Sequence, residues 1–182
     1  MKKKVLCLLL AVFITVASFA EEKNNAVFVD FGSIISGVFS GGFGLGLGYE
    51  RGLTDNFSAL FVASYLGFSN EILSIEFDST VISVGLAGRY YPLTNPVSGW
   101  FIDVGGIYSY INMSYDGEEA TSNIFELRLL TGWKIVFNSG FFLEPGVRYT
   151  VVLGDINYPS GTSDSAASIG GLSYFLGIGW AF

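Results

Sequence analysis

Strict alternation of large apolar and small residues along the stretch 171–182 most limits what this chain can fold into. One side of this stretch carries only large apolar residues: Leu172, Tyr174, Leu176, Ile178, Trp180 and Phe182. The other side carries mainly small ones: Gly171, Ser173, Phe175, Gly177, Gly179 and Ala181. A period of two residues is that of a β-strand, in which successive side chains point to opposite faces. The chain therefore ends in a strand with one apolar and one crowded face.

The same period of two recurs earlier in the chain. In the stretch 43–50, apolar residues alternate with glycines and one acid: Phe43, Leu45, Leu47 and Tyr49 against Gly44, Gly46, Gly48 and Glu50. In the stretch 125–137, one face consists of Phe125, Leu127, Leu129, Trp133, Ile135 and Phe137. Clusters of Gly, Asn, Asp, Ser and Pro separate such segments, as expected between strands. The pattern predicts no amphipathic helix and eight strands, at 26–35, 42–52, 57–67, 80–91, 100–111, 124–137, 141–153 and 168–182.

High hydropathy without a long apolar run favours a membrane β-barrel. Mean hydropathy is +0.51 and only 14% of residues are charged, yet no apolar run long enough for a membrane helix follows residue 20. A barrel spreads its apolar residues differently, because alternate residues face lipid. A soluble barrel is the alternative, but its outer face here would be mostly Gly, Ala and Ser, a poor aqueous surface. We expect an all-β fold, an eight-stranded antiparallel up-and-down transmembrane β-barrel.

The N-terminus has the three parts of a secretory signal peptide. Lysines precede an unbroken apolar run at 5–17, and a small-large-small triplet that ends at Ala20 follows. The run is shorter than the roughly 20 residues of a membrane-spanning helix, so an uncleaved anchor is the weaker alternative. We expect a signal peptide at 1–20 and one barrel domain at 21–182. Cys7 is the only cysteine and lies in this signal, so the mature domain has no thiol or disulfide chemistry.

The expected connections alternate between tight and long. The tight ones are 53–56, 92–99 and 138–140, and the long ones are 69–79, 112–123 and 154–167. In outer-membrane barrels the short turns are periplasmic and the long loops extracellular, and an even number of strands leaves both termini on the periplasmic side. We expect a protein of the bacterial outer membrane in this orientation.

The long connections are acidic and contain no lysine or arginine. Their acids are Glu71, Glu76, Asp78, Asp116, Glu118, Glu119, Asp155 and Asp164. A solvated, repulsive surface is one interpretation, and binding of divalent cations or of a basic partner is the other. Loops that grip lipopolysaccharide phosphates would instead favour basic residues. The net charge of −7 over the whole chain excludes a basic nucleic-acid-binding surface.

Nearly every charge within the expected strands falls on the lumen face. These residues are Asp30, Glu50, Arg89, Asp103, Glu126, Arg128, Lys134, Glu144 and Arg148. On the lipid face a basic residue near the midplane would cost about 2–4 kcal/mol, which explains the sorting. Four of them alternate in sign at similar heights on neighbouring strands: Arg89, Asp103, Lys134 and Glu144. We predict a ladder of ion pairs with Lys134 opposite Glu144, which blocks the lumen. Ordinary lumen packing and a transport or gating role both remain open.

Two segments resemble known outer-membrane proteins. A last strand of alternating aromatics, with Tyr174, Trp180 and the final Phe182, is similar to the signal that the barrel-assembly machinery reads. The stretch 46–56, Gly-Leu-Gly-Tyr-Glu-Arg-Gly-Leu-Thr-Asp-Asn, resembles the OmpA-like and OmpW-like small barrels. The resemblance implies the barrel part alone, because the chain has no room for the peptidoglycan-binding domain of full OmpA.

Residues that would carry catalysis are missing. The chain has no histidine, whereas the barrel enzymes of this membrane resemble one another in using a catalytic histidine. The glycine-rich stretch 41–48 lacks the preceding strand and following helix of a nucleotide-binding loop. We expect no enzyme, no cofactor and no metal.

Two classes of function fit these observations. The first is a structural or surface-interaction barrel that is closed to solutes. The second is a narrow OmpW-like channel for small or apolar solutes. The expected partners are outer-membrane lipid and, during biogenesis, the barrel-assembly machinery, and we expect a monomer that binds no nucleic acid.

Overall fold

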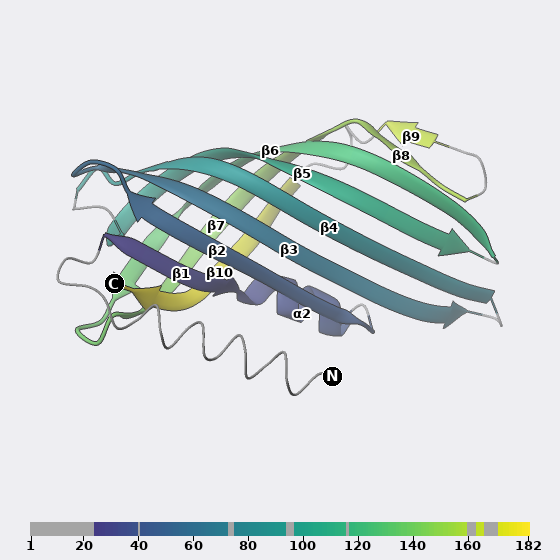
Figure 1. Cartoon of the computed structure of the whole chain (residues 1–182), viewed down its shortest axis with the longest axis horizontal. Helices are drawn as coiled ribbons and strands as arrows, with labels where there is room; N and C mark the ends of the chain where they lie inside the picture. Colours follow the sequence, from purple (N-terminus) through teal and green to yellow (C-terminus); the bar gives the residue numbers. More distant parts are fainter. Residues whose placement is uncertain are drawn as a thin grey trace.

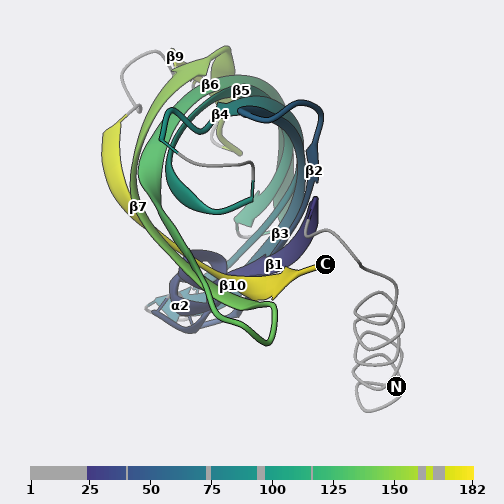
Figure 2. The same cartoon turned by 90° about the vertical axis from the view of Figure 1, so that its left-hand side faces the viewer.

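Eight strands form a closed antiparallel barrel (Figures 1 and 2). The computed structural model describes residues 24–39, 41–72, 75–93, 97–115, 117–159, 163–165 and 171–182. The barrel strands are β1 (Asn25–Asp30), β2 (Phe43–Gly52), β3 (Phe57–Ile72), β4 (Ile75–Tyr90), β5 (Gly99–Tyr115), β6 (Glu118–Val136), β7 (Phe141–Leu153) and β10 (Gly171–Ala181). The expected eight-stranded antiparallel barrel is confirmed. The predicted signal peptide, 1–20, lies outside the described residues.

The barrel closes where its first and last strands meet. β1 pairs with β2 on one side and with β10 on the other. Asn25 and Phe182 exchange two backbone hydrogen bonds, each 2.8 Å from nitrogen to oxygen. Strand closure removes exposed strand edges at this end of the sheet. The three connections that the sequence predicts to be tight lie at the same end of the barrel as the start of β1 and the C-terminus (Figure 1), and we call this end the short-turn end.

Large apolar side chains cover the outside of the barrel. Leu127, Leu129 and Trp133 on β6 are each almost half exposed, whereas Arg128 and Lys134 between them are buried. The faces therefore follow the sequence pattern, with apolar residues outward and charged residues in the lumen. This arrangement is the reverse of a soluble barrel, which turns its apolar face inward.

The prediction of long acidic loops at 69–79 and 112–123 is wrong, because most of these residues belong to extended strands. β3 and β4 continue to Ile72 and Ile75, and the ladder includes the pair of Glu71 with Glu76. β5 and β6 likewise continue to Tyr115 and Glu118. These stretches are rich in Ser, Asn, Asp and Glu and so resemble loops in sequence, but strand pairing uses backbone groups and does not require a wholly apolar face. Asp116 lies outside the described residues.

The third expected long connection contains a small sheet. β8 (Asp155–Asn157) pairs with β9 (Ser163–Ser165). Asn157 donates its backbone N–H to the Ser122 hydroxyl at 2.7 Å, and Ile156 packs on a buried apolar cluster of β5, β6 and β7. Residues 160–162 and 166–170, which include the expected start of the last strand at 168, lie outside the described residues.

The first strand is shorter than expected and is followed by a helix. β1 ends at Asp30, and helix α2 (Phe31–Phe39) begins at the next residue. The Asp30 carboxylate accepts hydrogen bonds from the Gly32 amide at 2.9 Å and from the Ser33 hydroxyl at 3.3 Å, which is an N-cap. The expectation of a strand to residue 35 and of no amphipathic helix is therefore wrong. Within the described part of the chain, no helix is long and apolar enough to cross a membrane.

Helix α2 lies against the part of the wall that β1 does not reach. Beyond Asp30, the strand residues 43–45 pair only with β3, and 171–176 pair only with β7. The helix contacts β2, β10 and β3 there. Its exposed face is apolar, with Phe31, Ile35 and Val38.

Helix α2 packs closely against the alternating glycines of β2. A Cβ atom on Gly44 would lie 1.9 Å from the backbone oxygen of Ser33, and one on Gly37 would lie 2.1 Å from the Gly44 nitrogen. A Cβ atom on Gly48 would lie 2.1 Å from the ring of Phe28. The glycine-rich stretch thus provides close packing on the lumen side of β2.

Candidate functional site

Arg89 on β4 is the centre of an ion-pair network inside the barrel. Its Nη1 lies 3.1 Å from Oε2 of Glu50 on β2. Its Nη2 lies 2.9 Å from Oδ2 of Asp103 on β5 and 2.8 Å from Oε1 of Glu144 on β7. All four side chains are fully buried. One guanidinium group therefore joins carboxylates from three other strands across the lumen.

Two further cations complete the network. The Lys134 Nζ on β6 lies 3.0 Å from Oε2 of Glu144 and also pairs with Glu50. Arg128, on the same strand, pairs through Nη2 with Oδ1 of Asp103 at 3.3 Å. We call the following six residues the plug: Glu50, Arg89, Asp103, Arg128, Lys134 and Glu144. Three acids face three bases, so each buried charge has an opposite partner, as burial requires.

Neutral hydroxyl groups complete the coordination of Glu50. The Tyr91 hydroxyl donates to Oε1 of Glu50 at 2.7 Å, and the Ser58 hydroxyl donates to the same oxygen. The other carboxylate oxygen, Oε2, is held by Arg89 and Lys134. Both oxygens of this buried carboxylate are therefore satisfied, which limits the cost of its desolvation.

Aromatic rings pack against the plug. The Arg89 guanidinium carbon lies 3.9 Å from the centroid of the Phe101 ring, and the Lys134 Nζ lies 4.6 Å from that of Phe142. Cations over aromatic faces gain electrostatic attraction, most strongly where water is excluded. The buried apolar cluster in this part of the lumen consists of Ala26, Phe28, Leu60, Tyr91, Val97, Phe101, Leu130, Phe142, Phe175 and Ala181. Charges and rings together fill the lumen at this height.

Two steps of the predicted ladder are present, Arg89 with Asp103 and Lys134 with Glu144. Asp103 pairs with Arg128 instead of Lys134, and the contact across the lumen was not predicted. Lys134 lies beside Glu144, as the register expects, because Ile135 pairs with Leu143. Glu50 was expected in the lumen but not in the ladder, since β2 does not neighbour β4 or β6. An eight-stranded barrel is narrow, so side chains of one height meet across it. The role of Ser58 was also missed, although its pairing with Arg89 in the strand register signals it.

The other three lumen charges lie outside the plug. The Arg148 Nη2 on β7 lies 3.3 Å from Oδ2 of Asp30, at the start of α2. Glu126 accepts a hydrogen bond from the Ser109 hydroxyl at 3.0 Å. The structure thus divides the nine predicted lumen charges into one joined group of six, one separate pair and one hydrogen-bonded acid.

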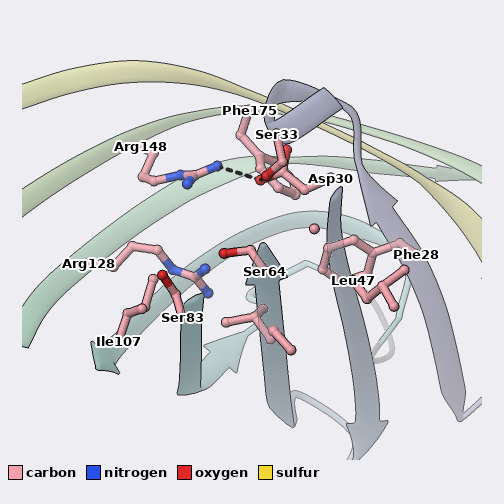
Figure 3. Close-up of a pocket in the computed structure, with 13 residues that line it drawn as sticks. Phe28, Asp30, Ser33, Leu47, Ser64, Ser83, Ile107, Arg128, Arg148 and Phe175 are labelled. Atoms are coloured by element: carbon pink, nitrogen blue, oxygen red, sulfur yellow. Dashed lines mark hydrogen bonds and ion pairs between the residues drawn. The ribbon is translucent and has the colours of Figure 1, made fainter. Parts of the chain in front are cut away.

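A hollow lies beyond the plug, toward the end of the barrel away from the termini. Its inner cavity has a volume of about 70 Å³, and Arg128 and Arg148 reach into it from neighbouring strands (Figure 3). A wider, open hollow of about 280 Å³ adjoins it. The two share the lining residues Asp30, Ser33, Ser64, Ser83 and Arg148. The lumen is therefore filled at one level and hollow at the next.

Comparison with known proteins identifies the architecture. The chain has the fold of the OprF N-terminal barrel. The crystal structure of that β-barrel domain, from Pseudomonas aeruginosa OprF, matches with a TM-score of 0.53 and 13% sequence identity. The match covers 87% of this chain and 98% of the OprF chain. No protein-family model and no curated protein sequence matches. The expected likeness to OmpA-type small barrels is thus shown for the fold.

The residues of the expected assembly signal lie on the outward face of β10 and at its end. Tyr174 is 87% exposed, and the side chains of Trp180 and Phe182 are partly exposed. The backbone of Phe182 is fixed by its two hydrogen bonds to Asn25. The side chain of this residue is therefore not what closes the barrel.

The described residues show charge pairing rather than a catalytic arrangement. No group of three or more His, Cys, Asp or Glu side chains suited to a metal ion occurs among them. The buried carboxylates of the plug point at Arg89, Arg128 and Lys134. Each of these three carboxylates therefore lies within ion-pair distance of at least one cation.

Proposed function

We propose that this chain is a non-enzymatic integral barrel of the bacterial outer membrane, closed to solutes, with a structural or surface-interaction role. The observation that carries the proposal is the plug, a fully buried network that joins Glu50, Arg89, Lys134 and Glu144 across the lumen. A passing ion would have to separate buried pairs, and leaving a buried charge without its partner is costly. In this proposal the protein is anchored in the membrane and presents its strand extensions at the surface.

The outer surface of the barrel supports the membrane location. Exposed apolar patches on soluble monomers rarely exceed a few hundred Å². Here the outward residues of β2 to β7 are repeatedly Phe, Tyr, Leu, Ile and Trp, and many are more than 40% exposed. Lipid is the solvent in which this surface is stable. The apolar outward face of α2 fits the same environment.

The orientation follows from signal-dependent export. Cleavage of a signal peptide at 1–20 in the periplasm would leave β1 as the first strand of the mature chain, and β1 pairs with the C-terminal strand at the short-turn end. The extended β3–β4 and β5–β6 hairpins then project outside the cell, where Asp78, Glu118 and Glu119 are exposed. The partners of this proposal are lipid, the barrel-assembly machinery during biogenesis and, at the surface, an external molecule. The closed sheet fits a monomer.

Planar-bilayer recording tests the closed lumen. We expect the mature protein, refolded and added to one side of the bilayer, to give no steady unitary current steps, because the plug fills the lumen. Protein-free detergent added in the same volume is the control for bilayer defects. Reproducible steps of one size that depend on the protein would contradict the closed lumen and establish the second candidate, a narrow channel. The hollow beyond the plug is the observation that favours this candidate.

Replacing Phe182 by Ala tests the proposed assembly signal. We expect the amount of folded protein in cells to fall at least several-fold, because the resemblance of this strand to the signal lies in its aromatic side chains. The backbone bonds to Asn25 remain, so refolding of the purified variant into lipid should match that of the wild type. Folded protein is measured by its faster gel migration before boiling. Equal folded amounts in cells would contradict recognition through Phe182, and a refolding defect would mean a structural role instead.

A further inference from the structure

Two arginines that reach into the inner cavity have few partners. Arg128 contacts Asp103 through Nη2 alone, at 3.3 and 3.5 Å. Arg148 contacts Asp30 through Nη2 alone, at 3.3 Å. The Nε atoms of both arginines are buried without a hydrogen-bond partner in the described part of the chain. A guanidinium group has five N–H donors, so most of the donor capacity of both side chains is unused.

Arg89 makes more and shorter ion pairs in the same lumen, although its Nε is likewise buried without a hydrogen-bond partner among the described residues. It holds three carboxylates at 2.8 to 3.1 Å through two nitrogens. The shortest ion-pair distances of Arg128 and Arg148 are both 3.3 Å, although the Arg128 side chain is only 5% exposed. Charge-assisted bonds of this type are commonly about 2.7–2.9 Å long. Each of the two cavity arginines therefore has fewer and longer ion pairs than Arg89.

The two arginines are also close neighbours of like charge. Arg128 pairs with Thr150, and Arg148 pairs with Leu130, so they occupy a diagonal position on adjacent strands. Diagonal side chains in a sheet are within reach of each other when they are long, and like charges at close range are destabilising. An anion between them would remove this repulsion.

The single carboxylate that lines the inner cavity, that of Asp30, is shared between Arg148 and the start of α2. Asp30 is held by the Gly32 amide and the Ser33 hydroxyl at the start of α2 as well as by Arg148. The charged side chains lining the inner cavity are thus two guanidinium groups and a single carboxylate. Glu126, the remaining lumen acid, accepts from Ser109 and is not part of this lining.

We propose that the inner cavity binds a small water-soluble oxyanion, of the phosphate or carboxylate class, between Arg128 and Arg148. The hydroxyl of Ser64, which faces the arginines in Figure 3, would donate to the same anion. A cavity of about 70 Å³ has room for a few waters or one small ion, and not for a larger solute. The open hollow supplies the route from solvent. This site is independent of whether the lumen conducts.

Calorimetric titration of the mature protein, folded in phosphate-free detergent, with inorganic phosphate and then acetate tests the site. We expect saturable binding with one site per chain. Arg148→Gln should weaken it about tenfold or more, since it removes a charge-assisted contact without touching the plug. Arg51→Gln, at an exposed position outside the lumen, removes the same charge and should leave binding unchanged.

A variant with the opposite expected sign sharpens the test. Asp30→Asn should tighten phosphate binding several-fold, because it removes the competing charge on Arg148, whereas asparagine caps a helix as well as aspartate does. Absence of saturable binding of both anions to the folded wild type, or equal binding by Arg148→Gln, would overturn the proposal.

A parallel titration with short-chain phosphatidic acid separates the two sources of phosphate. We expect free phosphate to bind better, and binding of the lipid alone would overturn the assignment to a soluble anion.

Discussion

Replacing Arg89 by Met is expected to lower the free energy of unfolding by about 3–5 kcal/mol, the usual cost of removing one partner from a buried ion pair. The reason lies in the number of carboxylates that depend on this side chain. Glu50, Asp103 and Glu144 would remain buried with only Lys134 and Arg128 to compensate them. Methionine fills much of the volume of arginine, so the loss of unfolding free energy reflects the missing charge and not a cavity left in the lumen.

Urea unfolding of the protein in lipid vesicles measures this effect. The three tryptophans, Trp100, Trp133 and Trp180, report the transition by fluorescence. The matched control is Arg51→Met, an exposed arginine on β2, which should change stability by less than about 0.5 kcal/mol. A loss from Arg89→Met no larger than that of the control would contradict a stabilising plug.

A double variant separates the plug from simple packing. Arg89→Met together with Glu144→Gln removes one surplus carboxylate along with the cation. We expect the combined loss to be smaller than the sum of the two single losses, because residues of one network do not act additively. Additive losses would show that Arg89 and Glu144 act independently, and the 2.8 Å contact would then carry little energy.

The sequence predicts those parts of the barrel in which one face differs chemically from the other. β7 has its predicted bounds, and β2 begins one residue later than expected. The lumen position of the charged residues is predictable for the same reason, since a charge on the apolar face would be costly. The strand extensions are not predicted, because Ser, Asn, Asp and Glu dominate them as they do loops, and the short alternations at Ile75 and Phe77 and at Met113 and Tyr115 are hidden among these residues.

Helix α2 was missed because the start of its sequence is ambiguous between helix and strand. The stretch 31–35 is Phe-Gly-Ser-Ile-Ile, which follows neither a clean strand period nor a full helical period, so it does not separate the two in sequence. The helical signal was present in the spacing of Phe31, Ile35 and Val38, three apolar residues on one helical face, and in the cap at Asp30. In this barrel the apolar face of the helix points outward, the reverse of the usual amphipathic helix of a globular protein.

Replacing Gly44 by Val is expected to displace α2 from the barrel. The new Cβ would lie 1.9 Å from the backbone oxygen of Ser33, and no side-chain rotation relieves a clash with backbone. The strand itself should tolerate valine, which favours β-structure. The strands of the wall therefore stay paired, while the helix loses its close packing against Gly44. Hydrogen exchange of the amides of α2, at 31–39, should become at least tenfold faster, as measured by mass spectrometry.

Gly88→Val is the matched control, because a Cβ at Gly88 on β4 has nothing within 4 Å. It should leave the exchange of α2 unchanged, so that any effect of Gly44→Val reflects contact with the helix and not the loss of a glycine. Exchange in β6 and β7 should stay slow in both variants, since neither strand pairs with β2. Unchanged protection of α2 in Gly44→Val would mean that the helix is held by its cap at Asp30 rather than by the glycines. Faster exchange throughout the barrel would mean that closure of the wall itself depends on the docked helix.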